Sequence, residues 1–180
     1  MAEAMLRNAA GDLGIRVRSA GTRALVGRPI PRRARVLSIR SGAPKAEVRA
    51  HRARWLDDAD LADVQLLLGM SRSHVEACTA RAPGLMRRSF TAREFARLSA
   101  GLSDGLIRET ADAVGDDPLA RVGALTRLLD SRRPLSAAVS AGDDDVIDPY
   151  RAGRRAYDAS AAQLVLAIEE IARALRVTLR

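Results

Sequence analysis

The residues whose types and spacing are best suited to catalysis are an acidic residue followed by proline and tyrosine, Asp148-Pro149-Tyr150. Pro149 restricts Asp148 to extended backbone conformations, so the carboxylate is presented rigidly. The ring of Tyr150 adds an aromatic wall beside it. A plain turn before a helix explains the same three residues, and the motif alone does not decide between the two interpretations.

Serine side chains follow two segments that are expected to be strands. Residues 15–19 alternate apolar and polar side chains, and residues 64–70 form a nearly unbroken apolar run, typical of a strand buried on both faces of a parallel sheet. Ser19 ends the first segment, and Ser71 follows the second. Because ligands bind beyond the carboxyl ends of strands in open α/β sheets, both serines are candidate site residues.

Helical patterns separate these strands. A helix is predicted over residues 1–12 with Gly14 as its C-cap, another is stopped by Gly42, and the last helix repeats apolar residues at four-three spacing from Tyr157 to Leu175. A further short strand is expected at residues 86–90. Helix starts are predicted from capping residues, namely Ser73 with Glu76, Thr91 with Glu94, and Asp117. Residues 99–145 are expected to be less regular apart from the helix after Asp117. The alternation favours an α/β domain with a parallel sheet.

Length and composition fit one globular domain with an aliphatic core. The chain has 180 residues, of which 47% are hydrophobic and 3% aromatic. Cys78 is the single cysteine, which excludes an internal disulfide and favours a reducing compartment. No apolar run reaches the roughly 18 residues of a membrane span, and the first residues lack the apolar stretch of a secretory signal. We therefore expect a cytoplasmic protein without a membrane partner.

The formal net charge is +8, and Lys45 is the single lysine among many arginines. A basic chain of this kind can bind nucleic acid or another polyanion. The arginines occur along the whole chain rather than on one element, which favours solvated charge and coding bias over a nucleic-acid partner.

Read in order, the segments MAEAMLR, SAGT, HRARWL, DLADVQLLLGM, FTAREFARL and DVIDPY resemble the low-molecular-weight protein tyrosine phosphatases. The resemblance covers nearly all of the chain except most of residues 99–142, which are interpreted as an insertion in a single domain. It implies a three-layer α/β/α, flavodoxin-like fold around a four-stranded parallel sheet of order 2-1-3-4. It also implies cofactor-free hydrolysis of phosphotyrosine proteins or small aryl phosphates through a phosphocysteine.

The resemblance assigns roles to residues that match its motifs. Asp148 matches the general acid that protonates the leaving oxygen, and Tyr150 matches an aromatic beside the substrate ring. Ser19 and His51 match the polar pair that supports the phosphate-binding loop.

Two further residues are expected at the substrate cleft. Leu25 aligns loosely with a pocket-wall position that is often aromatic in the family, and an aliphatic residue there weakens the case for phosphotyrosine. Ser71 follows a strand and is expected to line the cleft.

The family's catalytic loop, Cys-x5-Arg followed by Ser or Thr and Pro, is missing from the 180 residues. Cys78 does not open it, because Gly84 rather than arginine stands six residues later. The resemblance places this loop, with the first strand, just before a segment like MAEA. We therefore expect about 15 residues to be missing, through a truncated gene or a misassigned start, and the chain as given to be inactive.

A non-catalytic role is the alternative interpretation, either as a pseudophosphatase or as a basic protein that binds anionic partners. No metal site is expected, because His51 and His74 are the only histidines and the acidic residues 143–145 fit a solvated loop. The sequence leaves the oligomeric state open.

Overall fold

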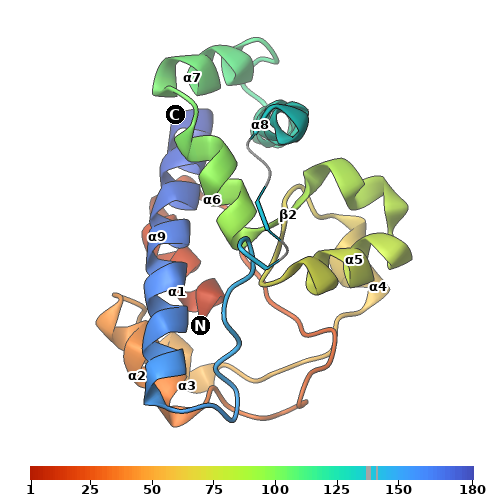
Figure 1. Ribbon diagram of the computed structural model, residues 1–180. Helices are drawn as coiled ribbons and strands as arrows, with labels where there is room; N and C mark the ends of the chain where they lie inside the picture. The colour runs from red at the N-terminus through yellow and green to blue at the C-terminus, as the bar shows by residue number, and fades with distance from the viewer. Residues whose placement is uncertain (137–138, 141) are drawn as a thin grey trace.

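One long helix organises the molecule. The computed structural model describes residues 1–136, 139–140 and 142–180. Helix α9 (Arg154–Leu179) is the long blue helix of Figure 1, and α1 (Ala2–Ala9), α2 (Arg32–Arg40) and α6 (Ala92–Ala100) pack against it. The predicted apolar spacing of α9 is confirmed, because Tyr157, Leu164, Ile171 and Leu175 are all buried. Their burial removes apolar surface from water and fixes α9 as the centre of the fold.

Two helices lie within residues 99–145, one after Asp117 as predicted and one in the part that was expected to be irregular. Helices α7 (Asp104–Asp112) and α8 (Pro118–Arg132) lie beyond α6, with the short 3₁₀ turn η3 (Arg133–Leu135) after them. Ile107, Leu125 and Leu129 of these helices are buried in the same core as α9. The prediction is confirmed for α8, which Asp117 caps, and was wrong for α7, whose Leu106 and Ile107 pack into the core although Asp104 and Gly105 stand in its first turn. The buried residues of both helices are thus part of the main core.

The sheet has two strands within the described residues. Strand β1 (Leu67–Gly69) pairs in parallel with β2 (Ser89–Thr91), with Leu68 opposite Phe90. These strands match the two runs predicted at residues 64–70 and 86–90. Beyond them, one isolated parallel bridge joins Gly21 to Trp55.

Residues 15–19 do not form the predicted strand. They alternate between part-buried and exposed side chains, as an extended segment does, but make no ladder with β1 in the described part of the chain. Instead, the carbonyl of Val17 accepts two hydrogen bonds from the Arg7 guanidinium, at 3.0 and 2.7 Å. A β-strand requires a second strand that hydrogen-bonds to its backbone, and the alternating pattern of residues 15–19 does not indicate whether such a strand is present.

The apolar run at residues 64–70 is only half-buried, so the expectation of burial on both faces was wrong. Leu66, Leu67 and Leu68 all keep intermediate exposure, although they pack beside the cores. Only β2 pairs with β1, so the opposite edge of β1 has no hydrogen-bonded strand among the described residues.

Short elements fill the chain between α1 and β1. They comprise the 3₁₀ turn η1 (Gly11–Leu13), α2, α3 (Lys45–Ala50) and α4 (Asp58–Ala62). Gly42, with a φ of +89°, follows the C-cap Ser41 and confirms the predicted stop of α2. The helix predicted over residues 1–12 ends earlier, at Ala9, and Gly14, with a φ of +66°, is instead the C-cap of η1. The loop at residues 21–28 is tied to residues 53–56 by backbone bonds such as Ala53 N to Arg28 O at 2.9 Å.

The predictions of helix N-caps were right at two helices and wrong at one. The capping box of Thr91 and Glu94 is confirmed at α6, and Asp117 caps α8 by accepting from the Ala120 amide at 3.0 Å. The box at Ser73 was wrong, because α5 (Arg72–Arg81) begins directly after Ser71. The 3₁₀ segment η2 (Pro83–Arg88) then leads into β2.

No helix of the described residues is long and apolar enough to cross a membrane.

Candidate functional site

Two of the expected site residues meet at the start of α1. The Ser19 hydroxyl donates a short hydrogen bond to Glu3 Oε2, and the His51 Nδ1 atom lies 3.4 Å from the same oxygen. The other carboxylate oxygen of Glu3 pairs with Arg7 at 2.8 Å. We call these four residues the Glu3 cluster. The sequence singled out Ser19 and His51 but missed Glu3, although Glu3 and Arg7 show the i,i+4 spacing of a helical ion pair.

Three backbone segments bring the cluster together. Glu3 lies in the first turn of α1, where a carboxylate is favoured by the helix dipole. His51 is the C-cap of α3, where its amide donates to the Glu47 carbonyl at 3.0 Å. Ser19 ends the extended segment that Arg7 holds through the Val17 carbonyl. The arrangement therefore depends on contacts that are distant in sequence.

A cavity of about 270 Å³ opens beside the Glu3 cluster, lined by Glu3, Arg7, Ile30, Glu47 and His51 among others. Burial lowers the pKa of His51, although the Glu3 carboxylate opposes that shift. Two carboxylates therefore face one guanidinium and a largely neutral imidazole. In this state the cavity does not favour an anion.

Asp148 and Tyr150 lie on an exposed turn before α9. The Asp148 Oδ1 atom accepts a hydrogen bond from the Tyr150 amide at 3.0 Å, so the carboxylate is held by its own turn. Arg151 has a φ of +59° and places its guanidinium 5.5 Å from the centre of the Tyr150 ring. No hydrogen bond or ion pair of the described residues joins Asp148 to the Glu3 cluster.

Leu25 and Ser71 take no part in the contacts of the Glu3 cluster. The Leu25 side chain is 53% exposed on the loop at residues 21–28. Ser71 precedes α5, and its hydroxyl contacts Ser73 Oγ at 2.9 Å and His74 Nδ1 at 3.0 Å. The structure thus brings Ser19 and His51 together, while Asp148, Tyr150, Leu25 and Ser71 make separate local contacts.

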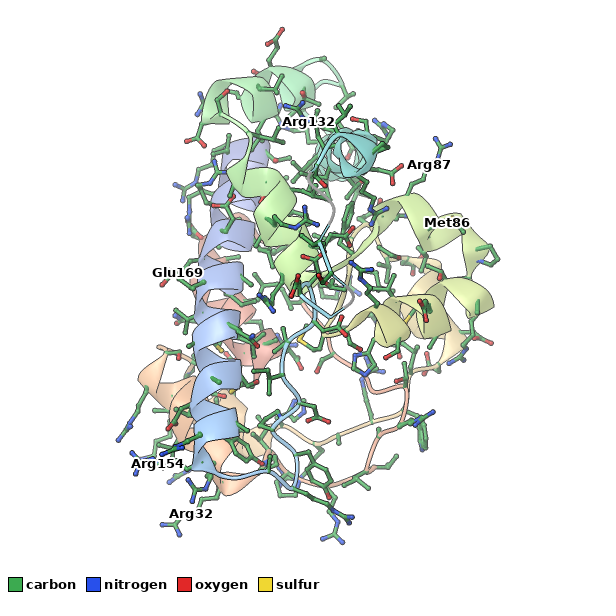
Figure 2. The ribbon with its side chains drawn as sticks, in the orientation of Figure 1. Arg32, Met86, Arg87, Arg132, Arg154 and Glu169 are labelled. Atoms are coloured by element: carbon green, nitrogen blue, oxygen red, sulfur yellow. The ribbon has the colours of Figure 1, made fainter. Side chains whose placement is uncertain are left out.

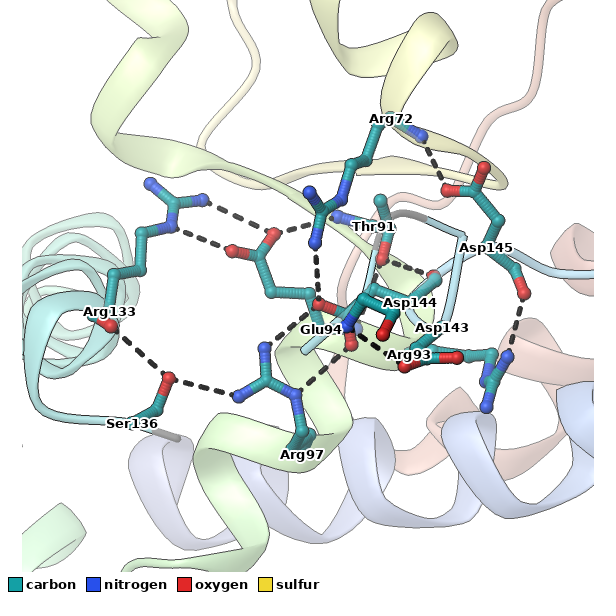
Figure 3. A network of polar contacts seen from close by, with 11 residues as sticks. Arg72, Thr91, Arg93, Glu94, Arg97, Arg133, Ser136, Asp143, Asp144 and Asp145 are labelled. Carbon is teal, nitrogen blue, oxygen red and sulfur yellow. Dashed lines mark hydrogen bonds and ion pairs between the residues drawn. The ribbon is translucent and has the colours of Figure 1, made fainter. Parts of the chain in front are cut away.

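A network of polar contacts anchors the chain just before Asp148 (Figure 3). Its centre is Asp144, which the Arg97 guanidinium holds at 3.1 and 2.9 Å. The Thr91 hydroxyl donates to the Asp144 carbonyl at 2.6 Å, and the Asp145 carboxylate accepts from the Arg72 amide at 2.8 Å. We call these five residues the Asp144 network. The expectation of a solvated loop at residues 143–145 was wrong for Asp144, whose burial the guanidinium makes possible.

Arg133 extends this network at the edge of β2. Its Nε atom donates to Glu94 at 2.9 Å, and its guanidinium lies 4.2 Å from the centre of the Phe90 ring. No local pattern indicates the contact with Glu94, because the two residues are about forty positions apart.

Cys78 is buried in α5 beside Leu61 and Leu85. Burial raises the pKa of its thiol, and Arg81 opposes that shift only in part. The residue fits the expected structural role. The described residues hold no group of three side chains suited to bind a metal ion.

Comparison with known proteins identifies the class. The family model described as low molecular weight phosphotyrosine protein phosphatase matches residues 1–109, more than half of the chain. The chain belongs to this family. No curated protein gives a significant match.

Two solved structures share the fold. Wzb from Vibrio vulnificus, in complex with benzylphosphonate, has a TM-score of 0.61 and 19% sequence identity, over 96% of this chain and 86% of that one. The low molecular weight protein tyrosine phosphatase from T. tengcongensis has a TM-score of 0.60 and 23% identity, over 94% and 86% of the two chains. The α/β class is therefore confirmed at the level of this family fold, with two paired strands and mostly helices.

Proposed function

We propose that these 180 residues form the acid-and-support part of a cysteine-dependent phosphomonoesterase and are inactive by themselves. The observation that carries the proposal is the meeting of Ser19 and His51 at the start of α1, within the segment that matches the family model. In this proposal Ser19 and His51, which both lie against Glu3 Oε2, are the polar pair that supports a loop beside that helix.

In this proposal Asp148 is the general acid. As a thiolate attacks phosphorus, the Asp148 carboxyl gives its proton to the leaving aryl oxygen. The resulting carboxylate then takes a proton from the water that attacks the phosphocysteine, which restores the acid and releases phosphate. The exposed turn at Asp148 supports this role, since the leaving oxygen of a substrate can reach the carboxyl group there.

The nucleophile is the part that this chain does not offer. Cys78 is buried with a raised thiol pKa, and no arginine stands six residues later. Without a thiolate and a phosphate-gripping arginine, the covalent route has no first step. We propose aryl phosphate monoesters as substrates, because benzylphosphonate, bound by the Vibrio relative, resembles such an ester.

The test is to supply a nucleophile loop. The 180-residue chain and a fusion that places a short strand and a Cys-x5-Arg-Ser-Pro segment before Met1 are assayed with an aryl phosphate. We expect hydrolysis only from the fusion, with a burst of aryl alcohol as the phosphocysteine forms. Asp148→Asn in the fusion lowers kcat by about 10²–10⁴-fold.

Two controls keep the test specific. Asp143→Asn removes an exposed carboxylate of the same segment, and Cys78→Ser removes the only thiol of the 180 residues; neither change is expected to alter kcat of the fusion. Hydrolysis by the 180-residue chain alone contradicts the proposal. So does a folded fusion that binds phosphate and never hydrolyses the ester.

A non-catalytic role is the second candidate, as a pseudophosphatase or as a basic protein for anionic partners. The observation that favours it is the uneven distribution of charge along the chain, with twelve arginine or lysine residues and one acidic residue in residues 15–55. A fusion that folds but stays inactive would support this role.

A further inference from the structure

Positive charge is concentrated in one segment rather than spread evenly, which corrects the impression given by the arginines alone. Residues 15–55 contain twelve arginine or lysine residues and a single acidic residue, Glu47. Their net charge of +11 exceeds the +8 of the whole chain, so the remaining residues are slightly acidic together. The uneven charge thus reflects where the aspartate and glutamate residues lie along the chain more than where the arginines lie.

Among the described residues, most of these cations have no side-chain partner. In that part of the chain Arg18 and Arg54 reach a carboxylate, that of Asp60, and the Arg52 guanidinium donates to backbone carbonyls. The others make no ion pair or side-chain hydrogen bond within the residues that the structure describes, and all but Arg35 are exposed. They are Arg16, Arg23, Arg28, Arg32, Arg33, Arg35, Arg40, Lys45 and Arg49.

The start of α9 adds cations to the same end of the molecule. Helix α2 contacts α9, and Arg32 and Arg154 both point outward at that end in Figure 2, far from the labelled Arg87 and Arg132. Arg151 and Arg155 are exposed beside Arg154. We call this surface, formed by residues 16–52 and 151–155, the basic end.

Exposed apolar side chains lie among these cations. Leu25 and Val26 are 53% and 57% exposed between Arg23 and Arg28, and Trp55 is 55% exposed on the segment bonded to their loop. Aliphatic side chains such as Leu25 and Val26 do not stack on nucleic-acid bases as aromatic rings do. They are suited to enter the boundary between lipid headgroups and acyl chains, where tryptophan is also favoured.

We propose that the basic end docks on an anionic phospholipid surface, with Leu25 and Val26 entering the headgroup layer. Clustered arginines attract acidic headgroups and grip their phosphates with paired N–H donors. This goes beyond the proposed function and does not depend on it. It also revises the expectation of a protein without a membrane partner, since docking on a surface needs no spanning helix.

The test is sedimentation of the intact chain with lipid vesicles. Phosphatidylcholine vesicles with about one third phosphatidylglycerol should bind the chain, pure phosphatidylcholine should not, and 1 M salt should release it. The triple variant Arg32→Gln, Arg33→Gln, Arg40→Gln should weaken binding about a hundredfold, as each arginine near such a surface is worth roughly fivefold.

Two further variants separate the possible partners. The pair Leu25→Ser and Val26→Ser should weaken vesicle binding about tenfold, as lost apolar insertion predicts, and leave binding of a single-stranded oligonucleotide unchanged. The matched control Arg87→Gln, Arg108→Gln, Arg127→Gln removes the same charge from exposed residues outside the basic end and should change vesicle binding less than about twofold.

Three results overturn the proposal. One is equal binding to charged and uncharged vesicles, and another is an equal loss from the control triple. The third is tight oligonucleotide binding together with vesicle binding that the Leu25→Ser and Val26→Ser pair does not weaken. That result would assign the basic end to nucleic acid. Because all substituted side chains are exposed, circular dichroism should report unchanged folding for every variant.

Discussion

The helices α6 to α9 and the segment at residues 15–57 are stabilised in different ways. In the helices, large side chains such as Phe95, Leu129 and Ile171 are fully buried in one continuous core. The segment at residues 15–57 buries mainly small or isolated apolar groups and is held by backbone bonds and by the Arg54–Asp60 pair. Loss of apolar contacts should therefore cost most in the helical half, while the segment at residues 15–57 should respond more to loss of its backbone bonds and of the Arg54–Asp60 pair.

The largest effect is expected from a cavity in the helical core. Ile171→Ala removes a fully buried side chain of α9 and should lower the free energy of unfolding by about 2–5 kcal/mol. Urea denaturation measures the change. Leu166→Ala, at a position 70% exposed on the same helix, is the matched control and should cost less than about 0.5 kcal/mol. Equal costs at the two positions would mean that burial in this core is not what stabilises the helical half.

A smaller effect is expected from the charge pair beside the segment. Asp60 accepts two bonds from the Arg54 guanidinium, at 2.5 and 2.7 Å, and this partner lowers the pKa of Asp60 to about 2. Asp60→Asn should lower the free energy of unfolding by about 1–2 kcal/mol at pH 7, because Arg54 keeps part of its hydration.

The pH dependence of that difference follows from the sign of the shift. The pKa of an aspartate in an unfolded chain is about 3.9, so the pair contributes fully above that pH. Its contribution is lost as the pH falls from about 4 through the folded value of about 2. Urea denaturation at pH 5 and pH 3 should show the gap between the native chain and Asp60→Asn narrowing. If the difference in free energy of unfolding between the native chain and Asp60→Asn did not change with pH, the Arg54–Asp60 pair would not be its source.

The predictions that held used information within a few residues. The spacing in α9, the box of Thr91 with Glu94 and the stop at Gly42 each depend on neighbours less than a few turns away. The strand at residues 15–19 failed because its existence depends on a pairing partner elsewhere. Asp144 was misread for the same reason, since its burial depends on Arg97, which is 47 positions away.

The candidate site was half predicted. The resemblance found Ser19 and His51, which the structure brings together, but it did not find Glu3, on which both converge. The contact between them needs α1, the end of α3 and an extended segment to meet in space. No pattern in the residues themselves specifies that meeting. The proposed roles of Asp148, Tyr150, Leu25 and Ser71 stay predictions.

The smallest effect concerns how two neighbouring helices begin. Helix α6 carries its own cap, because the Thr91 hydroxyl accepts from the Glu94 amide at 3.0 Å. Helix α5 does not: the Ser71 side chain makes no cap bond, and the Arg72 amide donates instead to Asp145. Thr91→Ala should thus cost about 1 kcal/mol or somewhat more, and Ser71→Ala less than about 0.5 kcal/mol.

Asp145→Ala completes this comparison, because it removes the distant carboxylate that stands in for the cap of α5. It should cost about 1 kcal/mol, close to Thr91→Ala and well above Ser71→Ala. Hydrogen exchange locates the loss: the first amides of α5 should exchange faster in Asp145→Ala and keep their protection in Ser71→Ala. The reverse order would mean that α5 begins by local capping after all, and that Asp145 is incidental. The expected order instead ties the start of α5 to the chain that leads into Asp148.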